Sequence, residues 1–154
     1  MSKITKLFAL CLFAGFITTI SAQMNMKFKG SDGWGIQGRY EQMYNNFNLE
    51  IFSGQITKID TITPIRDMSY GVQLIVKKDG TDVAVHLGPA WYILHQDMAF
   101  QIKDKVEVKA CNSTVDGKNV YMAVYVKNLS DRSNKILLLR DRDGIPAWCG
   151  YRKE

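Results

Sequence analysis

The hydrophobic pattern of this chain predicts a protein built mainly from β-strands. From Leu49 onward, apolar residues alternate with polar or small residues over five stretches, as expected of strands with one buried face. The alternating positions are Phe52 and Ile56, then Tyr70, Val72, Leu74 and Val76, then Val83, Val85 and Leu87, then Val106, Val108 and Ala110, and finally Val120, Met122, Val124 and Val126.

Two turn signals locate hairpins between these strands, and one change of phase locates a bend within the first strand. Asp79-Gly80 and Asp116-Gly117 each lie between two alternating stretches and predict a tight hairpin. In the first stretch, Ile59 falls out of phase with Ile56, which predicts a bulge or a sharp bend near Thr57.

A short helix is expected between the third and fourth strands. Gly88-Pro89 ends the third strand, and proline suits the first turn of a helix over residues 90–97. Five strands with a helix in this place predict an all-β protein with an OB-fold-like barrel over residues 49–129. An open sandwich is the competing all-β arrangement.

Two extensions flank the predicted barrel. Residues 23–48 begin with a Gly-rich part, followed by Tyr40, Met43, Tyr44 and Phe47 at the spacing of one helix face, which predicts a short N-terminal helix. Residues 130–154 carry an apolar run at 136–139, which predicts a C-terminal β extension packing on the barrel.

The first 22 residues predict export. Lys3 and Lys6 precede an apolar run of about 14 residues that ends at Ser21-Ala22, the pattern of a secretory signal peptide. Cleavage after Ala22 leaves a periplasmic or secreted domain with no further membrane span. It also lowers the formal charge from +5 to +3, because both lysines leave without an acidic residue. So small an excess of positive charge contributes little to binding nucleic acid. DNA binding is therefore the third hypothesis, after a binding module and a metal- or haem-handling protein.

Several stretches carry a resemblance to known families. Residues 53–56 (Ser-Gly-Gln-Ile), 83–86 (Val-Ala-Val-His) and 102–108 (Ile-Lys-Asp-Lys-Val-Glu-Val) resemble the exported bacterial OB-fold family, periplasmic proteins linked to stress tolerance. Residues 33–35, 68–72, 85–92 and 139–152 are similar to a group of small secreted bacterial proteins labelled DNA-binding or magnetosome-associated by analogy. The chain departs from this group at Cys149 and Tyr151. The resemblance implies a fold and carries no activity.

Cys111 and Cys149 are the two thiols that remain after export. In an oxidising compartment two cysteines are more often paired than free, so a structural disulfide is expected. In the chain-entropy account such a loop adds about 4 kcal/mol of stability. Two free thiols, or a metal or redox role, are the alternatives.

Outward aromatic residues are the candidates for ligand binding. By phase, His86 faces away from Val85, and two tyrosines share the outward face of the last barrel strand. The candidate ligand-binding residues are His86, Trp91, Tyr92, Tyr121 and Tyr125. Aromatic side chains on such a barrel stack against bases or sugar rings. Burial of the two tyrosines under the terminal extensions is nevertheless the preferred interpretation, because both extensions carry apolar residues that must be covered.

A metal- or haem-handling role is the alternative function. It would use His86 or His95, or the thioethers of Met24 and Met26, which are soft ligands. The two histidines lack the tight spacing of a metal-binding helix, and no third ligand is evident. The sequence contains no nucleophile elbow, zinc-protease helix, phosphate loop or dinucleotide fingerprint. We therefore expect a non-enzymatic binding module without a cofactor, with a protein, glycan or other polymer as partner.

Overall fold

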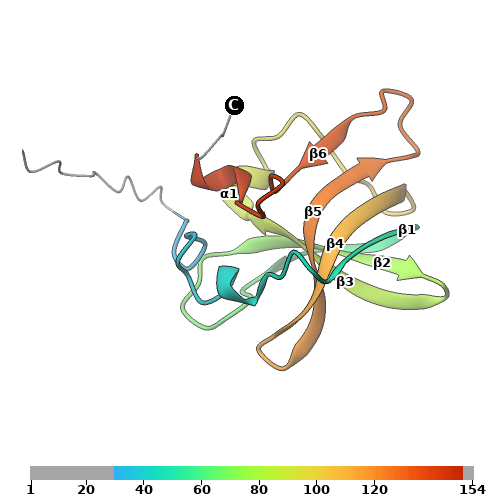
Figure 1. Cartoon of the computed structure of the whole chain (residues 1–154). Helices are drawn as coiled ribbons and strands as arrows, with labels where there is room; N and C mark the ends of the chain where they lie inside the picture. The colour runs from blue at the N-terminus through green and yellow to red at the C-terminus, as the bar shows by residue number, and fades with distance from the viewer. Residues whose placement is uncertain (1–29, 151–154) are drawn as a thin grey trace, which may run out of the picture.

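The computed structural model describes residues 30–150. In this range the chain forms six strands, one α-helical turn and two 3-10 turns (Figure 1). The strands are β1 (Leu49–Ile62), β2 (Gly71–Lys78), β3 (Thr81–Pro89), β4 (Lys105–Val115), β5 (Lys118–Asn128) and β6 (Ile136–Leu138). The helical turns are η1 (Glu41–Met43), α1 (Ala90–Ile93) and η2 (Ala147–Cys149). The expected all-β class is confirmed.

Five of the strands pair in a ring. β1 pairs with β2 and β4, β2 pairs with β3, and β4 pairs with β5, all antiparallel. A short parallel pairing of β3 with β5 closes the ring, and β6 is added at the outside of β5. The residues that fill the interior include Ile56, Leu74, Val76, Val85, Val106, Val108 and Ala110, each at most 1% exposed.

Strand β1 bends where the sequence predicted. Its register against β2 steps from Ile56 opposite Val76 to Lys58 opposite Ile75, so Thr57 is the extra residue of a bulge. Because a bulge kinks a strand and moves its side chains to the other face, β1 pairs with β4 before the bend and with β2 mainly after it.

Both predicted hairpin turns are present. Asp79 and Gly80 have φ of 49° and 82°, and Asp116 and Gly117 have φ of 48° and 75°. Two successive residues with positive φ make the tight turn whose twist fits an antiparallel hairpin. The helix after Pro89 also forms, although α1 ends at Ile93 and is shorter than predicted.

Two further bulges were not predicted. The register of β3 against β2 steps from Gly88 to His86, which makes Leu87 an extra residue. The register of β5 against β4 steps from Tyr125 to Ala123, which makes Val124 another. The bulge at Val124 reverses the inward and outward phase within β5, with consequences for its two tyrosines.

The predicted N-terminal helix is wrong. Only the 3-10 turn η1 forms, and Phe47, expected on the buried helix face, is 99% exposed. Tyr40 is nevertheless buried, because this segment lies against the ring of strands in an irregular conformation and places Tyr40 on His86. The helix-like spacing of apolar residues therefore indicated that Tyr40 is buried, but it did not indicate a helix.

The two terminal segments lie together on one side of the ring. Figure 1 shows the N-terminal segment in blue and η2 in red beside α1. Trp34 and Trp148 pack edge to face, with ring centroids 5.9 Å apart, and Trp148 Nε1 donates a hydrogen bond to the Trp34 carbonyl. Within residues 30–150, no helix has the length and apolar character that crossing a membrane requires.

Candidate functional site

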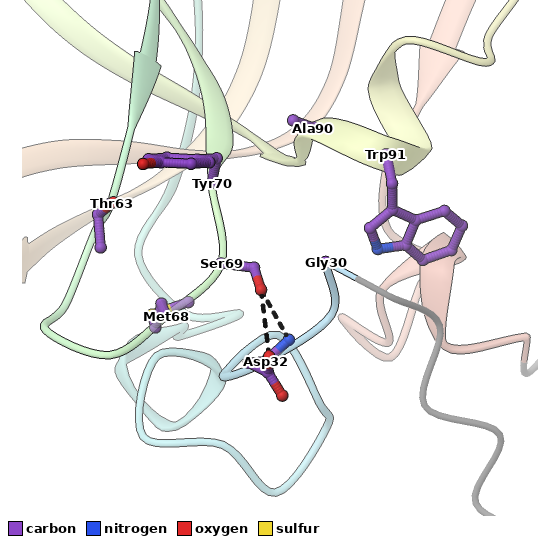
Figure 2. A pocket seen from close by; sticks show the side chains of 8 residues that line it. All are labelled: Gly30, Asp32, Thr63, Met68, Ser69, Tyr70, Ala90 and Trp91. Carbon is purple, nitrogen blue, oxygen red and sulfur yellow. Dashed lines mark hydrogen bonds between the residues drawn. The ribbon is translucent and has the colours of Figure 1, made fainter.

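An open pocket lies where the N-terminal segment, the β1–β2 loop and α1 meet (Figure 2). Its volume is about 530 Å³. The lining residues are Gly30, Asp32, Thr63, Met68, Ser69, Tyr70, Ala90 and Trp91. Tyr70 and Trp91 stand on opposite sides of the space, with Ser69 and Asp32 between them (Figure 2).

Backbone hydrogen bonds hold the two aromatic walls in place. Tyr70 lies directly before β2, and its carbonyl accepts a hydrogen bond of 2.9 Å from the N–H of Ala90, the first residue of α1. Trp91 follows in the same helical turn. The Tyr70 side chain is 68% exposed, so its ring is accessible to a ligand.

The floor of the pocket is a closed set of hydrogen bonds between Asp32 and Ser69. The Ser69 N–H donates to the Asp32 carbonyl at 2.9 Å, and the Asp32 N–H donates to Ser69 Oγ at 3.2 Å. The Ser69 hydroxyl lies 3.5 Å from Asp32 Oδ2, and Trp34 Nε1 donates to the Ser69 carbonyl. These bonds fix the N-terminal segment to the β1–β2 loop, so the floor is preorganised.

Gly33 allows this close approach. Its φ is +81°, and a Cβ at this position would lie 2.3 Å from Cγ of Met68. Glycine adopts positive φ without strain and leaves the space that Met68 occupies. Gly33 therefore lets Gly30 and Asp32 of the N-terminal segment line the pocket beside Met68.

The pocket combines flat apolar surfaces with short polar side chains. Tyr70 and Trp91 offer ring faces, and Thr63, Ser69 and Asp32 offer hydroxyl and carboxylate groups. Apolar walls with a few fixed polar groups are typical of ligand pockets. The pocket therefore offers ring faces for stacking and polar groups for hydrogen bonding.

Of the residues that the sequence singled out, Trp91 lines this pocket. Tyr92 lies behind it and contacts both Trp91 and Trp148, with centroid separations of 5.8 Å and 5.9 Å. Tyr70, Ser69 and Asp32 were missed as site residues. The stretch 68–72 was one of those that carried the family resemblance, which was the available signal for them.

His86 is buried, contrary to the expected exposure. Its register opposite Gln73 and Met122 places it on the outward side of β3, but Tyr40 covers it. The Tyr40 hydroxyl lies 3.1 Å from His86 Nδ1, and His86 is 5% exposed. Burial lowers the pKa of His86 to about 4, so the ring is neutral at pH 7.

Tyr121 and Tyr125 lie on opposite faces of β5, which corrects the expectation that they share one. Tyr121 packs on Phe52 at 4.9 Å between centroids and accepts a hydrogen bond from Lys78 Nζ at 3.0 Å. Tyr125 lies opposite Lys109 on the outside and donates to Glu107. The bulge at Val124 between them is the cause.

The residues proposed for a metal site do not form a cluster. His86 is engaged by Tyr40, and His95 Nδ1 is hydrogen-bonded to the Trp91 carbonyl. Met24 and Met26 lie outside the described residues, as does the predicted signal segment. Over residues 30–150, no group of three or more His, Cys, Asp or Glu side chains is placed to hold a metal ion.

The expected disulfide is not formed. Cys111 is a buried free thiol that accepts a hydrogen bond from the Asn45 N–H at 3.3 Å. Cys149 is a half-buried free thiol in η2, 3.8 Å from the Trp34 carbonyl. Each thiol therefore packs against a different part of the N-terminal segment.

Together the ring of strands and the pocket define a small β-protein with an open, aromatic-flanked pocket. Residues 48–132, more than half of the chain, match the MamS/MamX magnetosome protein family, and the chain belongs to this family. Searches of curated proteins and of solved structures gave no match. The matched range contains Tyr70, Ser69 and Trp91 but not Asp32.

Proposed function

We propose that this chain is an exported, non-enzymatic binding module whose ligand occupies the pocket between Tyr70 and Trp91. The observation that carries the proposal is this pocket, with accessible aromatic walls and a hydrogen-bonded floor. Export follows from the signal-like pattern of residues 1–22.

An OB-fold-like barrel is the scaffold that we propose. The closed pairing of β1 to β5, the bend in β1 and the position of α1 between β3 and β4 support it. Barrels of this class bind oligosaccharides and oligonucleotides on an exposed face. Here the pocket lies beside α1, where the terminal segments extend the barrel surface.

A glycan is the ligand class that fits the lining best. Sugar rings present an apolar face that stacks on aromatic side chains, and an edge of hydroxyl groups that needs both donors and acceptors. Tyr70 and Trp91 supply the first, and Ser69, Thr63 and Asp32 supply the second. No lysine or arginine lines the pocket to neutralise a phosphate backbone, which argues against nucleic acid there.

Calorimetric titration of the full chain with chitotetraose, cellotetraose and maltotetraose tests this proposal. At least one of these probes is expected to bind. Tyr70→Ala should then weaken binding by about tenfold, or ~1.4 kcal/mol, without lowering stability, since Tyr70 is largely exposed.

Phe47→Ala is the matched control, because Phe47 is also an exposed aromatic residue but lies before β1 and does not line the pocket. It should leave the affinity unchanged. Equal losses in both variants would contradict the pocket as the site. Absence of binding to all three probes would contradict the glycan assignment.

A further inference from the structure

A continuous series of aromatic rings joins the pocket to the buried histidine. Neighbouring members contact one another through five ring pairs. These are Trp91–Tyr92 (5.8 Å between centroids), Tyr92–Trp148 (5.9 Å), Trp148–Trp34 (5.9 Å), Trp34–Tyr40 (4.8 Å) and Tyr40–His86 (5.9 Å). We call these six residues the aromatic chain. It draws on the N-terminal segment, β3, α1 and η2.

The two ends of the aromatic chain differ in accessibility. Trp91 is half-buried and lines the open pocket, whereas Trp34 and Tyr40 are each 1% exposed and Trp148 is 8% exposed. The chain therefore leads from the surface into the protein. Tryptophan and tyrosine are the side chains, with cysteine, that lose one electron most readily.

At the Tyr40 end a base is aligned to accept a proton, in contrast to Trp34 and Trp148. Trp34 Nε1 donates to the Ser69 carbonyl and Trp148 Nε1 donates to the Trp34 carbonyl, each at 2.9 Å. Carbonyl oxygens are very weak bases, so these indoles keep their protons when oxidised. The Tyr40 hydroxyl instead lies 3.1 Å from an imidazole nitrogen. Because an oxidised phenol is a very strong acid, it gives its proton even to this buried imidazole, whose pKa burial lowers.

The guanidinium of Arg140 lies close enough to Trp148 to disfavour positive charge on its ring. The guanidinium carbon lies 5.3 Å from the Trp148 ring centroid, where the positive charge disfavours an indole radical cation. Tyr40 forms a neutral phenoxyl radical when its proton moves to His86, so no charge develops on its own ring. The oxidised protein is therefore expected to have a lower free energy when the electron is missing from Tyr40 than when it is missing from Trp148.

We propose that the aromatic chain conducts a single oxidising equivalent from the pocket to the hydrogen-bonded Tyr40–His86 pair. The oxidant is an oxygen-centred radical that takes one electron from Trp91 and, after taking a proton from water, leaves as an alcohol. The electron vacancy passes to Trp148 across the Tyr92 ring, then to Trp34, and then to Tyr40. Tyr40 loses its electron to Trp34 and its proton to His86 Nδ1, which leaves a phenoxyl radical beside an imidazolium.

The activity that follows is protection of the pocket. Radical damage that begins on Trp91 is transferred to a buried pair where the phenoxyl is shielded from solvent. This inference does not depend on the ligand of the pocket, because it rests on the ring contacts and on the Tyr40–His86 hydrogen bond alone.

Laser flash-quench oxidation of the full chain by a ruthenium(III) polypyridyl complex tests the proposal. Transient absorption should show an indole radical that decays as a phenoxyl radical appears, and electron paramagnetic resonance should detect that phenoxyl. Tyr40→Phe should remove most of the phenoxyl signal and lengthen the lifetime of the indole radical several-fold. His86→Gln should have the same effect, because the tyrosine then lacks its proton acceptor.

Two controls separate this route from direct oxidation of surface tyrosines. Tyr125→Phe removes a tyrosine on the outer face of β5, away from the pocket and the aromatic chain, and should leave the slow phenoxyl phase unchanged. Tyr92→Leu interrupts the aromatic chain near its surface end and should slow that phase several-fold. The proposal is overturned if Tyr40→Phe retains the wild-type radical kinetics, or if Tyr92→Leu leaves the slow phase unaltered while near-ultraviolet circular dichroism shows a native fold.

Discussion

Arg140 and Glu41, 99 positions apart in the chain, form a two-pronged ion pair beneath the terminal segments. Arg140 Nη2 donates to Glu41 Oε1 at 3.1 Å, and Nη1 donates to Oε2 and to the Gly144 carbonyl. The guanidinium also lies over the Tyr44 ring, 4.4 Å from its centroid. The Arg140 side chain is 1% exposed and that of Glu41 5%, so the pair joins both ends of the described chain inside the protein.

Removing one member of this pair should destabilise the protein strongly. We expect Arg140→Met to lower the free energy of unfolding by about 3–5 kcal/mol, because the Glu41 carboxylate is then buried without its cation. Urea unfolding measures the change. The double variant Arg140→Met with Glu41→Leu should recover part of the loss. A single-variant loss below about 1 kcal/mol would show that the pair is solvated.

Stability should fall on acidification because of His86. The pKa of His86 is about 4 in the folded protein against 6.5 for the free side chain. Between these values the unfolded chain binds a proton that the folded protein does not, so the free energy of unfolding decreases as the pH falls. The contribution is about 3 kcal/mol.

His86→Gln isolates this contribution from those of other groups. The unfolding free energy of the wild type minus that of the variant should fall by about 3 kcal/mol as the pH is lowered from about 7 to about 4. A difference that stays constant over this range would place the histidine in contact with water.

Tyr121 and Tyr125 should respond differently to truncation, since the bulge at Val124 puts them on opposite faces. Tyr121→Ala removes the ring that packs on Phe52 and the acceptor of the Lys78 hydrogen bond. We expect a loss of about 2 kcal/mol. Tyr125→Ala removes an outer contact with Glu107 and should cost less than about 1 kcal/mol. Equal effects of the two substitutions on thermal unfolding would contradict the register of β5.

Gly88 marks the contact between β3 and the C-terminal segment. Its φ is +149°, and a Cβ there would lie 2.6 Å from Cζ3 of Trp148. Gly88→Ala should therefore lower the free energy of unfolding by at least about 2 kcal/mol, through strain and through displacement of the indole.

Gly35→Ala is the control for this substitution. A Cβ at Gly35 meets no atom within 4 Å, and the change in stability should stay below about 1 kcal/mol. If Gly88→Ala were equally mild, η2 would not be packed on β3 as described.

The elements that could be predicted are those set by local rules. Alternation of apolar residues located all five ring strands, the two Asp-Gly turns located the hairpins, and the phase change before Ile59 located the bulge at Thr57. In each case neighbouring residues determine the backbone conformation, so the sequence contains the signal.

The elements that were missed depend on contacts between distant segments. The phase of β5 carries no break that reveals the bulge at Val124, because Val120, Met122, Val124 and Val126 alternate throughout it. Near Met122 the outer face is buried as well, because the N-terminal segment lies against its pairing partner Cys111. The burial of His86 and Arg140 likewise follows from the position of Tyr40 and Glu41, which no local pattern indicates.

The candidate site was predicted in part for the same reason. Trp91 was singled out as an aromatic residue of the helix, whereas Tyr70, Ser69 and Asp32 belong to loops. Tyr70 was assigned to the alternating face of the second strand, but β2 begins at Gly71 and leaves its ring exposed. The hydrogen bonds between Asp32 and Ser69, across 37 positions, and the bond from the Ala90 N–H to the Tyr70 carbonyl bring these residues together.

The most direct test of the pocket as the binding site is a ¹H–¹⁵N correlation spectrum of the labelled chain during titration with the oligosaccharide that binds in calorimetry. We expect the largest shifts at the backbone amides of Ser69, Tyr70 and Ala90 and at the indole N–H of Trp91. Shifts concentrated instead on Lys109 and Tyr125, on the outer face of β4 and β5, would contradict this expectation.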